Sequence, residues 1–181
     1  VEKIIDDVQY TGGVLASAEQ SPHRLLYTTP ELKTALHMSG TPVVTLRMAA
    51  NKPAANLSVW LVSLPFDGKV VGSAGQLGVI SRGWADPQNH KSLNKGGNYN
   101  SKEAGTPLVP GQFVDLKFDL QPGDRVIPAG KRLALMIMSS DREFTLWPKA
   151  GTELSIETDA SSIGFPVVGG MSAIKAAFGI K

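Results

Sequence analysis

Short segments in which apolar and polar residues alternate recur along the chain. The clearest is 112–120, where apolar residues at every second position would share one face while Asp115, Lys117 and Asp119 lie on the other. An alternation with a period of two is typical of a β-strand that buries one face. Six more segments show a similar pattern: 24–28, 43–49, 57–64, 77–82, 143–147 and 153–158.

The segment 132–139 differs because apolar residues occupy both sets of alternating positions. The two sets are Leu133, Leu135 and Ile137 on one side and Ala134, Met136 and Met138 on the other. A strand that is apolar on both faces is typical of a central position in a covered sheet. The pattern therefore predicts that 132–139 is a central strand.

Prolines leave little room for long helices. The chain has 12 prolines, and a proline inside a helix costs about 3 kcal/mol. Turn-forming sequences separate several of the predicted strands: Asp67-Gly68, Pro110-Gly111, Pro122-Gly123-Asp124 and Ala129-Gly130. About eight short strands joined in this way predict an all-β sandwich or barrel.

Two regions interrupt this pattern. Residues 83–106 are rich in Asn, Gly and Lys, and they predict a long loop of the kind that is usually functional or disordered. The tail that begins at Asp159 contains the pair Gly169-Gly170 and predicts a short helix over 171–178. We expect one β domain with a tail at each end.

Composition narrows the classes of function. A length of 181 residues fits one domain of roughly 100–200 residues. The net charge of +2 does not favour nucleic acid as a partner, and no apolar run approaches the roughly 18 residues of a membrane span. The absence of cysteine excludes disulfides, a thiolate nucleophile and cysteine-bound zinc.

The N-terminal residues are where a start methionine and a targeting signal would lie. The chain opens Val1-Glu2-Lys3, with neither an initiator methionine nor a signal-peptide pattern. We therefore expect it to be a piece of a longer protein, and its compartment, cytoplasmic or secreted, stays open.

Motifs for catalysis are weak. The nearest approach to a nucleophile elbow, G-x-S-x-G, surrounds Ser73, but Val71 occupies the first glycine position and no helix is predicted to follow. His23, His37 and His90 are far apart in the sequence and lack metal-binding spacing. His90 lies near acidic and amide side chains in the long loop, which leaves a weak metal site as an alternative. We expect no cofactor and no catalytic residue in this chain.

Aromatic and charged residues near strand ends are the candidate contact residues. Trp60 lies in the middle of a predicted strand, where a core role is expected. The candidates for a contact with another domain or with a ligand are Arg82, Trp84, Tyr99, Asp141 and Trp147. Exposed rings could stack on a sugar, but packing against a neighbouring domain is the favoured interpretation. Arg82 and Asp141 could instead form a local ion pair that stabilises a turn.

The order of several segments resembles a known family. The segments are 25–32, 38–42, 43–49, 57–64, 66–68, 78–83, 107–111, 127–133 and 138–141, the last reading Met-Ser-Ser-Asp. Together they resemble the C-terminal non-catalytic domain of the X-Pro dipeptidyl-peptidase and cocaine-esterase family of serine hydrolases. The similarity runs from about residue 24 to residue 158.

The resemblance implies a jelly-roll β-sandwich of the galactose-binding-like type, which follows an α/β-hydrolase domain that carries the catalytic serine. Residues 1–23 would then be a linker from the upstream catalytic domain, 24–158 the β-sandwich, and 159–181 a C-terminal tail. Such a domain would support the hydrolase domain, help to form the substrate entrance or contribute to contacts in a homo-oligomer. The alternative is an independent carbohydrate-binding module, because the same sandwich class includes sugar binders.

Overall fold

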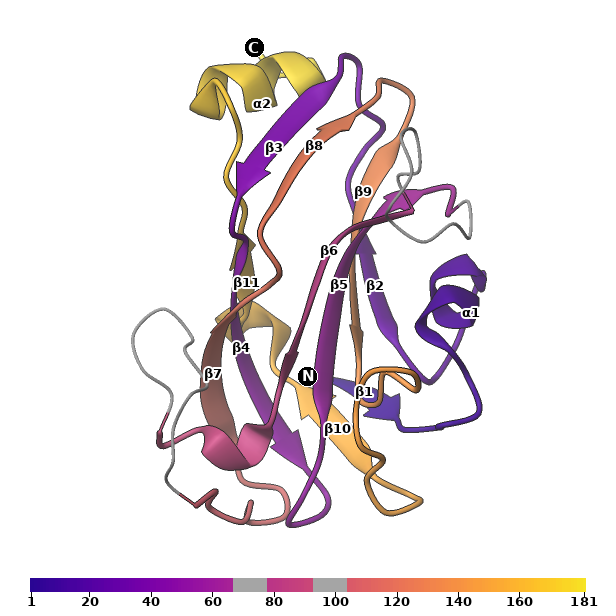
Figure 1. Ribbon diagram of the computed structural model, residues 1–181, viewed down its shortest axis with the longest axis vertical. Coiled ribbons are helices and arrows are strands. Elements are labelled where there is room, and N and C mark those ends of the chain that lie inside the picture. The colour runs from indigo at the N-terminus through magenta and orange to yellow at the C-terminus, as the bar shows by residue number, and fades with distance from the viewer. Residues whose placement is uncertain (67–77, 93–103) are drawn as a thin grey trace.

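The computed structural model describes residues 1–66, 78–92 and 104–181. Most of the regular structure in this part of the chain is antiparallel β-strand (Figure 1). The strands form two larger sheets and a small two-stranded sheet near the end of the molecule that carries α2 (Gly170–Phe178). The prediction of an all-β sandwich is confirmed. Its finer likeness to galactose-binding-like domains stays a prediction.

The first sheet is built around β4 (Val43–Ala50). One edge of β4 pairs with β7 (Val114–Asp119), while the other edge pairs with β10 (Glu153–Ile156) and with β11 (Ser162–Gly164). β1 (Glu2–Ile5) extends this sheet by pairing with β10. Segments from both ends of the chain therefore complete the sheet.

The second sheet has the strand order β2-β9-β5-β6. Its strands are β2 (Leu25–Thr28), β9 (Arg132–Met138), β5 (Leu57–Leu64) and β6 (Val79–Ala85). The small sheet pairs β3 (Leu36–Gly40) with β8 (Gly123–Ile127). The helical elements besides α2 are α1 (Gly12–Ser17) and two short 3-10 turns, η1 (Pro87–Asn89) and η2 (Thr158–Ala160).

The second sheet is buried on both faces along β9, as the sequence predicts. Leu133 and Ile137 belong to the large core between the sheets. Met136 and Met138 belong to a smaller core on the opposite face, where α1 adds Leu15. The central position predicted for this strand is confirmed.

The expected strand over 143–147 is wrong, because this segment forms a turn. The amides of Phe144 and Thr145 both donate to the carbonyl oxygen of Asp141, each over 2.9 Å. The hydroxyl of Thr145 also accepts from the Asp141 amide over 3.1 Å. These local bonds use the groups that a strand would need for pairing.

Other boundaries also differ from the sequence-based expectation. β6 runs through Ala85, so the long loop begins later than residue 83, and the 3-10 turn η1 orders its first part. The segment Gly123–Ile127, expected as a turn at its start, is β8. The remainder of the predicted loop at 93–103 and the turn Asp67-Gly68 lie outside the described residues.

The tails take part in the fold as follows. Residues 1–23 contain β1 and α1, and residues 159–181 contain β11 and α2. The amide of Lys33 donates to the carbonyl oxygen of Ala177 in α2, whose side chain is fully buried. The three-part division of the chain at residues 23 and 158 stays a prediction.

Candidate functional site

Asp141 occupies the centre of a polar and aromatic cluster on the outer face of the second sheet. It follows β9 and is fully buried. Its Oδ2 accepts one hydrogen bond from Nε1 of Trp60 and one from Nε1 of Trp84, each over 2.9 Å. Trp60 comes from β5 and Trp84 from β6, so one carboxylate group connects the end of β9 to the next two strands on one side of the sheet.

Arg82 completes this cluster. It pairs with Trp60 across β5 and β6 and lies two residues before Trp84, so all three side chains share one face. Its guanidinium carbon lies 3.9 Å from the ring centre of Phe144 and about equally far from both indoles, 5.5 Å for Trp60 and 5.4 Å for Trp84. These distances are typical of cation–π contacts. We call Trp60, Arg82, Trp84, Asp141 and Phe144 the aspartate cluster.

Burial raises the pKa of the Asp141 carboxyl above its ordinary value. The indole bonds from Trp84 and Trp60 and the positive charge of Arg82 act in the opposite direction, because they favour the ionised form. The Oδ1 atom of Asp141 is buried and has no hydrogen-bond partner among the described residues. The two indoles and Arg82 are therefore the groups that stabilise the ionised form of this carboxyl group in the described structure.

The turn after Asp141 carries an exposed apolar surface. Phe144 is 49% exposed, Leu146 is 88% exposed and Trp147 is 56% exposed. The indole of Trp147 donates to the carbonyl oxygen of Arg142 over 3.2 Å, and Arg142 donates to the carbonyl oxygen of Gln9 over 2.8 Å. We call Phe144, Leu146 and Trp147 the turn patch.

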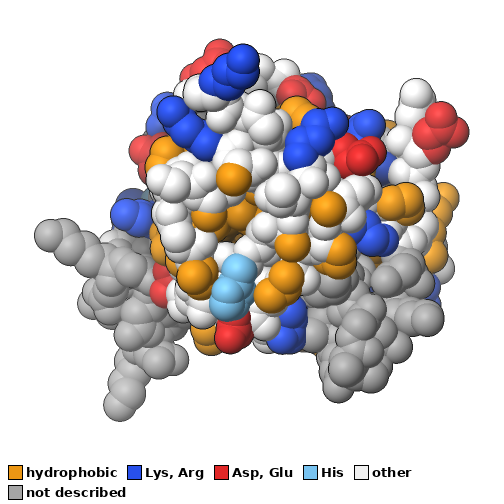
Figure 2. Space-filling model, turned by 90° about the horizontal axis from the view of Figure 1, so that it is seen from above, with side chains coloured by type: hydrophobic (Ala, Val, Ile, Leu, Met, Phe, Trp, Pro, Cys, Tyr) orange, Lys and Arg blue, Asp and Glu red, His pale blue; other side chains and the backbone are white. Residues whose placement is uncertain are grey.

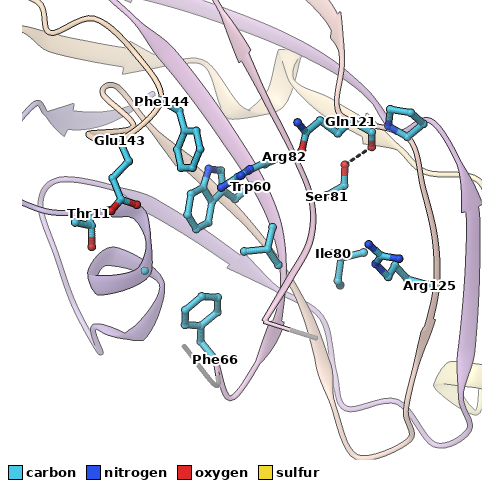
Figure 3. A pocket seen from close by; sticks show the side chains of 13 residues that line it. Thr11, Trp60, Phe66, Ile80, Ser81, Arg82, Gln121, Arg125, Glu143 and Phe144 are labelled. Carbon is cyan, nitrogen blue, oxygen red and sulfur yellow. Dashed lines mark hydrogen bonds between the residues drawn. The ribbon is translucent and has the colours of Figure 1, made fainter. Parts of the chain in front are cut away.

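A cavity of about 380 Å³ opens beside the aspartate cluster (Figure 3). Its wall includes apolar and aromatic side chains from Trp60, Phe66 and Phe144. Arg82 and Arg125 also line it, as does Glu143, which lies near Thr11 in Figure 3. We call it the α1–β8 pocket, because Gly13 of α1 and Arg125 of β8 both contribute to its wall.

The structure brings together three of the five candidate contact residues. Arg82, Trp84 and Asp141 belong to the aspartate cluster. Trp147 lies on the same turn as Asp141, but its ring is part of the turn patch. Tyr99 lies outside the described residues. The role of all five as contact residues stays a prediction.

Sequence reasoning missed other members of this region. Trp60 is buried as expected, with 4% exposure, but its indole also has a polar role. Phe144 was expected in a strand, and nothing in the sequence pattern singled out Arg125. Trp60, Arg82 and Trp84 share one face of the sheet, and this could have indicated the cluster. The shared face can be recognised only once the pairing of β5 with β6 is known.

The motifs considered for hydrolysis or metal binding have ordinary surroundings where they are described. His37 pairs with Asp124, the ring of His23 bonds to the carbonyl oxygen of Ile5, and that of His90 bonds to the carbonyl oxygen of Pro87. Within residues 1–66, 78–92 and 104–181, no three His, Asp or Glu side chains are grouped as metal ligands. In the same ranges, no helix has the length and apolar character needed to cross a bilayer. Ser73 lies outside the described residues.

Comparison with known sequences identifies the chain's relatives. The family model of the X-Pro dipeptidyl-peptidase C-terminal non-catalytic domain matches residues 3–173. A provisionally assigned Xaa-Pro dipeptidyl-peptidase of Rhodopirellula baltica is 50% identical over 169 residues, which are 93% of this chain and 25% of that protein. The Xaa-Pro dipeptidyl-peptidase of Lacticaseibacillus rhamnosus is 30% identical over 171 residues, with 79% of this chain and 20% of that protein covered.

Comparison with solved structures supports the fold. An α-amino acid ester hydrolase matches with a TM-score of 0.61 at 18% identity, over 83% of this chain and 26% of that one. A CocE/NonD family hydrolase from Staphylococcus aureus matches with a TM-score of 0.58 at 14% identity, over 80% of this chain and 30% of that one. The chain thus spans about a quarter of the length of the first relatives that it matches. It belongs to the family of X-Pro dipeptidyl-peptidase C-terminal non-catalytic domains.

Proposed function

We propose that the chain acts as an accessory domain that packs against an α/β-hydrolase domain of the same protein and supports its Xaa-Pro dipeptidyl-peptidase activity. The names of the sequence relatives support the activity, and their greater length supports the presence of a further domain. The catalytic serine would lie in that other domain. The family assignment favours this function over the alternative of an independent carbohydrate-binding module.

The observation that carries this proposal is the turn patch. Phe144, Leu146 and Trp147 expose large apolar surfaces within four consecutive positions. A contiguous exposed apolar surface often marks an interaction site, and aromatic residues are enriched at interfaces. The patch is therefore the part of this chain best suited to contact the hydrolase domain.

The aspartate cluster supports the patch from below. The indoles of Trp60 and Trp84 fix the side chain of Asp141, which is the first residue of the turn. Arg82 contacts the ring of Phe144 within the turn. The carbonyl oxygen of Leu146 accepts a hydrogen bond from the amide group of Asn56. A surface whose backbone is fixed before binding loses less conformational entropy when the partner docks.

A second exposed apolar area provides a control surface. Val126, Val168 and Met171 are each at least half exposed, on β8 and around the start of α2. Figure 2 shows the end of the molecule from above, where hydrophobic side chains gather around a hollow. In Figure 1, α2 lies at the opposite end of the molecule from β10, the strand that follows the turn patch.

The test uses the full-length parent protein that contains this chain. We expect the double substitution Leu146→Ser and Trp147→Ser to loosen the domain contact, so that the apparent melting transition splits and turnover of an Xaa-Pro p-nitroanilide falls about tenfold or more. The matched control, Val168→Ser with Met171→Ser, should leave both measurements unchanged. Circular dichroism of each variant establishes that the β-sandwich is folded.

Two results would contradict the proposal. One is a parent protein whose melting and turnover respond to the control pair and not to the turn-patch pair. The other is a variant that keeps both properties but loses a homo-oligomeric state, which would assign the patch to contacts between copies.

A further inference from the structure

We propose that the α1–β8 pocket is a binding site for a small organic carboxylate whose acid group is attached to an aromatic or branched apolar body. The inference rests on the lining of the pocket itself, which shares Phe144 with the turn patch. A volume of about 380 Å³ lies within the roughly 300–1,000 Å³ that is usual for small-molecule sites.

The basis for the acid group is the state of Arg125. Its Nε atom is buried and has no hydrogen-bond acceptor among the described residues. One terminal nitrogen, Nη1, donates to the carbonyl oxygen of Asp124 over 3.0 Å, while the carboxylate of Asp124 pairs with His37. Arg125 is therefore a cation without an acidic partner in the described structure. A carboxylate would supply the missing acceptor, because guanidinium and carboxylate groups match in shape and charge.

The other charged groups that face the pocket do not cancel this charge. Arg82 is also positive, and it interacts electrostatically with the buried carboxyl group of Asp141 in the aspartate cluster. Glu143 is the acidic side chain of the wall, and Figure 3 shows it beside Thr11, away from Arg125 and Ile80. The pocket thus has a positive end near Arg125 and an acidic group at its other end.

The apolar body of the ligand has surfaces to contact between these ends. Trp60 and Phe66 line the pocket between Glu143 and Arg125 in Figure 3, and Val79 adds an aliphatic wall. Near Arg125, the hydroxyl of Ser81 is already engaged with the carbonyl oxygen of Gln121 over 2.6 Å. The two guanidinium groups are the cationic groups of the wall, and its aromatic and aliphatic side chains favour an apolar group.

The experiment is calorimetric titration of the 181-residue chain with 3-phenylpropionate and, separately, with the neutral 3-phenylpropanamide. We expect the acid to bind at least tenfold more tightly than the amide, and added salt to weaken only the acid. Arg125→Gln should lower affinity for the acid at least tenfold and leave affinity for the amide unchanged. Arg132→Gln, which removes the same charge from an exposed position outside this pocket, should have no effect on either.

Arg125→Lys provides a second variant if Arg125→Gln does not fold. It keeps the charge but lacks the planar guanidinium fork that can bind both carboxylate oxygens, so we expect it to bind the acid less tightly than the unaltered chain. Equal binding of acid and amide, no binding of the acid at millimolar concentration, or full affinity in both Arg125 variants would each overturn the inference. So would binding that is lost when the chain is part of its full-length parent, because the pocket would then be covered by another domain.

Discussion

Removal of the Asp141 side chain is the most direct test of the aspartate cluster. Asp141→Ala leaves the Nε1 donors of Trp60 and Trp84 without their acceptor. An unsatisfied buried donor costs about 1–3 kcal/mol, and this full range applies to Trp60, which is only 4% exposed. Trp84 is half-buried, so water can replace part of its bond and its share is about 1 kcal/mol.

Together these losses predict a decrease of about 2–4 kcal/mol in the free energy of unfolding for Asp141→Ala. Asp141→Asn keeps one oxygen that can accept from both indoles, so we expect it to be at least about 1 kcal/mol more stable than Asp141→Ala. The surface control is Asp115→Ala, which breaks an exposed pair with Arg47. Its expected cost is about 0–1 kcal/mol.

Urea unfolding followed by tryptophan fluorescence measures all three variants, and linear extrapolation gives the free energies of unfolding. The reasoning is refuted if Asp141→Ala loses no more stability than Asp115→Ala. It is also refuted if Asp141→Asn and Asp141→Ala are equally stable, because the indole bonds would then contribute nothing measurable.

Two further predictions concern pH and the core. Because the pKa of Asp141 is raised in the folded protein above the value of 3.8 for an ordinary carboxyl group, the folded state binds its proton more tightly than the unfolded state. The contribution of Asp141 to the free energy of unfolding is therefore most favourable below about pH 3.8. It is lost as the pH rises through the raised pKa of the folded state. Urea unfolding at a series of pH values should show the unaltered chain losing stability relative to Asp141→Asn over that window, and a constant difference would contradict the assignment. Ile137→Ala should lower the free energy of unfolding by about 2–5 kcal/mol, because Ile137 is 2% exposed between the two sheets. Leu135→Ala, on the same strand, should lower it by less, because Leu135 is only partly buried. Chemical denaturation compares the two, and equal losses would mean that burial along β9 is misjudged.

The alternation of apolar and polar residues was sufficient to find most long strands. It predicts β4, β5, β7 and β9 because each buries at least one face against a large core. It fails for β1 and β11, which are short edge strands stabilised by pairing with β10 and β4, and for β3 and β8, which pair with each other in the small sheet. It also fails at 143–147, where hydrogen bonds back to Asp141 override the tendency to form a strand. Short-range pattern thus identifies segments held by burial, and it misses those held by long-range pairing or by local side-chain bonds.

The candidate site depends more strongly on long-range pairing than the fold does. Arg82, Trp84 and Asp141 are recognisable in the sequence as polar or aromatic residues at strand ends, but their contact requires β9, β5 and β6 to be neighbours in that order. A shift of one residue between β5 and β6 would move Arg82 and Trp84 to the face opposite Trp60. The register Trp60 with Arg82 instead places the guanidinium over the indole and leaves Phe144 to cover it. The same register exposes the wall of the α1–β8 pocket, so the cluster that fixes the turn patch also forms one side of the proposed carboxylate site.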